Sequence, residues 1–131
     1  MLKRIWKLIF GRSINDAINE TKKVKVEGVN FVIRKINILD HMQGAKVLKQ
    51  IYDSYKVETA GPKAEIEVSE KRIKEHYRDV LMAGVVDPAL SAKEGEPNTI
   101  FVDKMFCNWD LVNGLYAEIM AFAYGKKKLI H

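Results

Sequence analysis

The segment that decides the fold is Phe101–Gly125, FVDKMFCNWDLVNGLYAEIMAFAYG, which carries the densest set of apolar residues in the chain. Its apolar residues recur every three or four positions, as on the buried face of a helix. They are Phe101, Met105, Phe106, Trp109, Val112, Leu115, Tyr116, Ile119, Phe122 and Ala123. Gly125 is typical of a residue that ends a helix. We therefore expect the core of the protein to centre on this segment.

The chain upstream of this segment predicts a second helix followed by a loop. Glu58–Val68 contains Gly61-Pro62 and interrupts the helical pattern, whereas Ser69 is a suitable N-cap for a helix that ends near Gly84. Val85–Pro88 cannot continue that helix through its proline, and the polar run SAKEGEPN at 91–98 is rich in turn-forming residues.

Further toward the N-terminus the sequence predicts a β-hairpin and then a third helix. Val24 and Val26 alternate with lysines, Glu27-Gly28 offers a turn, and Phe31 and Ile33 alternate again. Asn37 can cap a helix in which apolar residues recur every three or four positions. These residues are Ile38, Met42, Ala45, Leu48, Tyr52 and Tyr55.

The first 23 residues differ from the rest. Leu2, Ile5, Trp6 and Ile9 fall at helical spacing opposite lysine and arginine, and Gly11–Lys23 is polar. We expect residues 1–23 to form a basic amphipathic helix with a linker, and residues 24–131 to form one globular domain of a hairpin and about four helices. The predicted fold class is mainly α with a small N-terminal β-hairpin (α+β).

Composition narrows the classes of function. The chain of 131 residues has a net charge of +5, but its basic residues are spread over four clusters mixed with glutamate, which disfavours a nucleic-acid reader. No apolar run reaches the roughly 20 residues that cross a bilayer, and a short basic helix binds membranes only weakly. Cys107 is the only cysteine, so a reducing cytoplasm fits, and its aromatic neighbours predict a buried thiol.

The sequence offers no recognisable catalytic constellation. His41, His76 and His131 are widely separated, and surface or half-buried positions account for them without a metal. Glu65, Glu67 and Glu70 have no accompanying base or nucleophile and are expected on a solvated face. Phosphate-binding glycine loops and a Gly-x-Ser-x-Gly motif are also absent from the sequence. We expect no enzyme activity, no cofactor and no small-molecule substrate.

Two stretches resemble the tail assembly chaperones of long-tailed bacteriophages and prophages. One is the hairpin that leads into INILD at 36–40 and a helix, and the other is the helix end VLMAGVVDP at 80–88, followed by a polar loop and a closing apolar helix. The resemblance covers roughly Val24 to Lys128. Met1–Phe10 does not belong to the pattern.

This resemblance implies a small cytoplasmic protein of the bacterial host that binds the tape measure protein, and also tail tube subunits, until the tail assembles. It also implies a longer form made by ribosomal frameshifting, for which Gly125–Lys128 can be encoded by an adenine-rich run. A client-free homo-oligomer could cover an apolar client groove. The alternatives are a structural component of the virion, in the neck or baseplate, and a small basic nucleic-acid-binding protein.

The expected client surface consists of exposed members of the apolar helix faces, because aromatic and methionine side chains dominate interface cores. The candidates are Trp6, Met42, Tyr52, Tyr55, Tyr77 and Trp109. Each of them can instead belong to the fold core.

Overall fold

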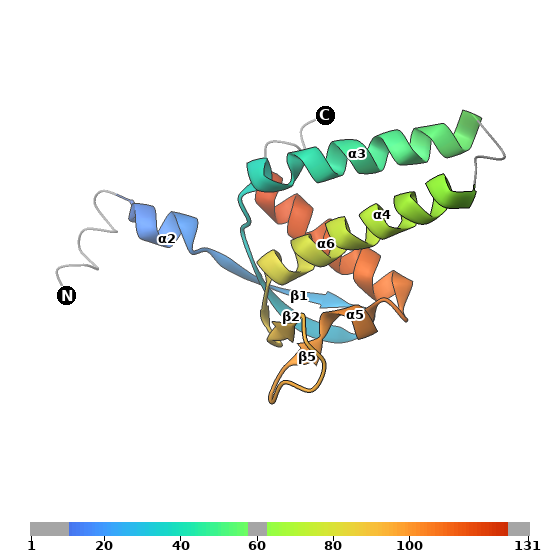
Figure 1. Ribbon diagram of the computed structural model, residues 1–131. Coiled ribbons are helices and arrows are strands. Elements are labelled where there is room, and N and C mark those ends of the chain that lie inside the picture. The colour runs from blue at the N-terminus through green and yellow to red at the C-terminus, as the bar shows by residue number, and fades with distance from the viewer. Residues whose placement is uncertain (1–10, 58–62, 126–131) are drawn as a thin grey trace.

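A computed structural model of the protein describes residues 11–57 and 63–125 (Figure 1). The predicted basic helix at 1–10, with Trp6, and the tail from 126 with the expected frameshift site lie outside the described residues. The chain forms an α+β fold. In chain order, the elements are α2 (Ile14–Ile18), β1 (Thr21–Val26), β2 (Val29–Arg34), α3 (Ile38–Val57), α4 (Lys63–Gly84), β3 (Val85–Asp87), β4 (Leu90–Ser91), β5 (Ile100–Phe101), α5 (Val102–Met105) and α6 (Trp109–Tyr124).

The predicted hairpin is confirmed as β1 and β2, which pair in antiparallel register from Thr21–Arg34 to Val26–Val29. The turn forms at Glu27-Gly28, where φ is 50° and 76°. Two successive positive φ values define the turn whose twist matches that of the paired strands, and glycine tolerates this conformation without strain. The first strand begins at Thr21, so the predicted linker ends earlier than Lys23.

A third strand, which the sequence pattern does not predict, joins this hairpin. β3 pairs antiparallel with β2, so that the sheet order is β1-β2-β3. The sequence indicates only that Val85–Pro88 does not continue the helix, because a strand of three residues carries no measurable alternation. The strand forms because the free edge of β2 supplies a partner, which is a tertiary effect.

Helices α3 and α4 run antiparallel, side by side, above the rest of the molecule (Figure 1). Asn37 opens α3 as predicted, since its Oδ1 accepts a hydrogen bond from the Leu39 N–H at 3.1 Å. Helix α4 ends at Gly84 as predicted, but it begins at Lys63, and the prediction of Ser69 as its N-cap is wrong. Gly61-Pro62 directly precedes the helix in the sequence, and proline is common at helix starts. The pair therefore indicates where α4 begins, and the helical pattern is not interrupted as far as Val68.

Helix α6 is the centre of the core, as the sequence predicted. Val112, Leu115 and Ile119 are fully buried, and α6 contacts both the hairpin on one side and α4 on the other. Asn108 caps its start by accepting a hydrogen bond from the Leu111 N–H, and Gly125 ends it. At Gly114 the helix comes so close to the sheet that an added Cβ would lie 2.7 Å from a methyl group of Val26.

Candidate interaction surfaces

An aromatic cluster joins α4 to α6. His76 and Tyr77 of α4 are buried, with 7% and 4% of their surface exposed. The His76 Nε2 and the Tyr116 hydroxyl are hydrogen-bonded at 2.8 Å, and the Tyr77 hydroxyl donates to Asn113 Oδ1 at 3.2 Å. The ring of Trp109 meets the ring of Tyr77 edge-on, with 4.9 Å between centroids. The cluster therefore holds α4 and α6 together.

His76 also contacts α3, which passes directly over its imidazole. An ideal Cβ at Gly44 would overlap His76 Nδ1, so only glycine lets α3 pack this closely. Burial lowers the pKa of His76, repulsion from His41 lowers it further, and Asp79 opposes these two effects. The sequence interpretation of His76 as a surface or half-buried residue is wrong, because Tyr116 satisfies its ring nitrogen inside the core.

The structure separates the residues that the sequence proposed as a client surface. Tyr77 is buried, so its assignment to that surface is wrong, because its ring fills the space between α4 and α6. Met42 and Trp109 are exposed at 52% and 43%. They lie apart, since Trp109 opens α6 whereas Met42 lies near the start of α3, where α6 ends (Figure 1). Tyr52 and Tyr55 are in α3, and their side chains lie outside the described residues.

The prediction of a buried Cys107 is also wrong, because its thiol is exposed. Cys107 lies in the turn that joins α5 to α6, where its N–H donates to the Lys104 carbonyl at 3.2 Å. Phe106, its neighbour, packs against the core instead. The short turn lets one residue of the pair face inward and the other face solvent.

Exposed apolar residues belong to two helix ends that lie near each other, the start of α3 and the end of α6 (Figure 1). Leu39 is 72% exposed and Met42, one helical turn later, is 52% exposed. Tyr124 in the last turn of α6 is 50% exposed. We call these three residues the α3 patch. Sequence reasoning found Met42 but missed Leu39, which stands beside the apolar stripe of α3, and Tyr124, which was not singled out from the closing helix.

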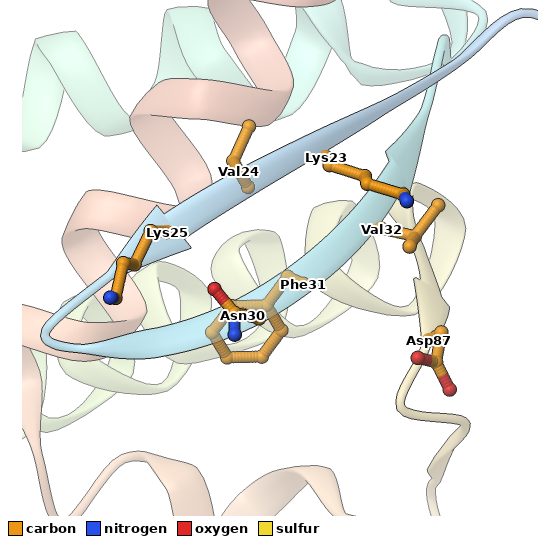
Figure 2. Close-up of a pocket in the computed structure, with 7 residues that line it drawn as sticks. All are labelled: Lys23, Val24, Lys25, Asn30, Phe31, Val32 and Asp87. Atoms are coloured by element: carbon orange, nitrogen blue, oxygen red, sulfur yellow. The ribbon is translucent and has the colours of Figure 1, made fainter.

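The sheet presents a second surface, on the side facing away from α6. An open hollow of about 510 Å³ is lined there by residues of three strands (Figure 2), namely Lys23, Val24, Lys25, Asn30, Phe31, Val32 and Asp87. Val24 and Phe31 pack into the core on the opposite side. Lys23, Lys25, Asn30, Val32 and Asp87 therefore form what we call the open face.

Within residues 11–57 and 63–125, no three histidine, cysteine, aspartate or glutamate side chains come together as metal ligands. In the same residues, no helix has both the length and the apolar character needed to span a membrane.

Comparison with known proteins adds no relative. No family model, no curated protein and no solved structure matches the chain. The function must therefore be argued from the residues and from the geometry of the two surfaces.

Proposed function

We propose that the protein is a non-catalytic binding protein that holds an amphipathic helix of a client protein on the α3 patch. The observation that carries this proposal is the pair Leu39 and Met42, exposed one turn apart on the same helix. Fully burying a leucine or methionine side chain is worth about 1.5–3 kcal/mol, so the patch offers a client substantial binding energy. A helix docks on such a stripe through its own apolar side chains at a spacing of three and four residues.

The polar side chains around the patch favour a client of a particular chemistry. Lys46 and Lys49 continue the exposed side of α3 beyond Met42, at positions one and two turns further along. The two lysines form a basic border at the end of the apolar stripe, and Gln43 is an uncharged polar neighbour. A client helix whose apolar face is flanked by carboxylates would match this border, and such charges raise the association rate and the specificity more than the affinity.

We further propose that the client is a tape measure protein, and that the protein is a tail assembly chaperone in the cytoplasm of a phage-infected bacterial cell. Tail tube subunits are a second client of the same kind. The resemblance at 36–40 and 80–88 supports this proposal, together with an apolar patch suited to a long helical client. Self-association that covers the α3 patch would give the client-free protein a way to stay in solution.

The test is co-expression with a candidate tape measure protein, a long helical protein encoded by the same genome, followed by affinity purification through this chain. Wild type should keep the client soluble and co-purify with it, whereas Leu39→Lys/Met42→Lys should lose most of the bound client. Ile14→Lys/Ile18→Lys is the matched control, because these isoleucines of α2 are also exposed and lie away from the patch. It should retain the client.

Three outcomes would contradict the proposal. A client that stays insoluble in the presence of wild-type protein would remove the chaperone function. Mass spectrometry that finds the protein as a stoichiometric part of purified particles would favour a structural virion component instead. Equal loss of client in both double variants would remove the α3 patch from the argument.

A further inference from the structure

The open face carries three kinds of side chain in a fixed order across the strands. The register pairs Lys23 of β1 with Val32 of β2, and Val32 with Asp87 of β3. Residues that stand opposite each other in neighbouring strands share a face of the sheet. Across the strands, the row therefore consists of a cation, an apolar side chain and a carboxylate, in that order. Lys25 and Asn30 form a second pair beside it (Figure 2).

The charges of this row are not satisfied within the described residues. None of the ion pairs found there involves Lys23, Lys25 or Asp87, and these three side chains are exposed. The other lysine at this end of β1, Lys22, points to the opposite side and lies over the ring of Phe122. The open face is thus a mainly polar surface with one apolar residue, Val32, between its opposite charges.

We propose that the open face docks a second helix of the client protein, laid across the strands. The docked helix carries a carboxylate over Lys23 and Lys25, an apolar side chain over Val32 and a cation beside Asp87. This inference rests on the proposed function, because it assigns a further contact to the same client. The order of the charges selects the helix and fixes its direction across the sheet.

The spacing of the row suits a helix. Neighbouring strands lie about 4.8 Å apart, so Lys23, Val32 and Asp87 project from positions separated by about that distance. Side chains three and four residues apart on a helix are about 5–6 Å from each other. Residues i, i+4 and i+7 of a client helix can therefore stand over the three members of the row in turn.

Two other occupants fit the charges less well. A nucleic acid would place phosphates beside Asp87 as well as beside the two lysines, and the carboxylate would repel them. A second copy of this sheet, turned about an axis parallel to the strands, would set Lys23 of each copy over Asp87 of the other, but it would leave Lys25 with no carboxylate directly opposite it. A partner that carries both signs of charge satisfies the entire row.

The test compares client binding by wild type, by Lys23→Glu/Lys25→Glu and by Lys71→Glu/Lys104→Glu. The last variant is the control, because Lys71 and Lys104 are also exposed and the change in net charge is the same. We expect the open-face variant to bind the tape measure protein about tenfold more weakly, since two attractive pairs become repulsive, while the control changes by less than about twofold. Equal binding by all three proteins would overturn this inference and leave the α3 patch proposal standing. No binding by wild type would overturn both.

Asp87→Asn distinguishes the helix from a polyanion. Removing the carboxylate should weaken binding of the client about threefold, because the client cation loses its partner. The same substitution should strengthen binding of a single-stranded oligonucleotide that is used as the probe. Stronger client binding by Asp87→Asn, or loss of oligonucleotide binding alone in Lys23→Glu/Lys25→Glu, would show that the face serves a polyanion and would refute the proposal.

Discussion

Gly44→Ala is the sharpest test of how α3 is held on the core. The added Cβ would overlap Nδ1 of His76 and would lie 3.1 Å from its Cε1 and 3.2 Å from its Cγ. The imidazole cannot turn away freely, because its Nε2 is hydrogen-bonded to Tyr116 at 2.8 Å. Forcing extra volume into a packed site costs about 1–3 kcal/mol, whereas alanine is better than glycine within a helix by about 1 kcal/mol.

The difference between these two effects gives an expected loss of up to about 2 kcal/mol in the free energy of unfolding. The sign should reverse when His76 is already alanine, because the contact is gone and only the helix preference of about 1 kcal/mol remains. Urea unfolding followed by far-UV circular dichroism measures all four proteins of this cycle. Gln43→Ala, on the exposed neighbouring position of α3, is the control and should change stability little. A stabilising Gly44→Ala in the wild-type background, or equal effects in both backgrounds, would refute the packing argument.

Three further predictions concern His76, the hairpin turn and Cys107. The pKa of His76 is lowered in the folded state, so the unfolded chain takes up the proton first and stability should fall as the pH drops below about 6.5. Unfolding of wild type and of His76→Gln across this pH range tests this prediction. An equal pH dependence in both proteins would contradict it. Glu27→Asn should stabilise the protein by about 0.5–1 kcal/mol, because asparagine tolerates the positive φ of the turn. Thermal unfolding measures the change in stability, and a lower melting temperature in the variant would count against the turn geometry. The exposed Cys107 should react with a maleimide in the native protein at a rate close to that in denaturant, whereas strong protection in the native state would place it in the core.

Most of the fold could be predicted because its signals are local. The hairpin follows from alternation and from Glu27-Gly28, and α3 begins where Asn37 can accept a backbone hydrogen bond. The burial of α6 follows from the density and period of its apolar residues. The failures depend on distant partners: Val85–Asp87 becomes a strand only because β2 has a free edge, and Cys107 is exposed because a tight turn directs Phe106 inward.

The candidate surfaces were harder to predict for a related reason. A sequence shows which residues are apolar, but exposure depends on what the neighbouring elements cover. Tyr77 and Met42 have the same helical spacing signal, yet α6 covers Tyr77 and leaves Met42 in solvent. The alternation of lysine with valine in β1 predicts that the lysine side of the strand faces solvent. Its relation to Asp87 required the third strand, which local pattern did not reveal.

The open face and the α3 patch are both held in place by α6, so the distance between them is fixed. The open face is the outer side of a sheet whose inner side rests on α6, and the α3 patch includes Tyr124 in the last turn of the same helix. A rigid central helix fixes the distance between the two surfaces, so a client that reached both would gain from the high effective concentration of its second contact. Such a client must have two helical segments with enough chain between them to pass around the sheet. A long helical protein meets that requirement more readily than a compact globular one, which is why two separated surfaces on one small domain favour an extended client.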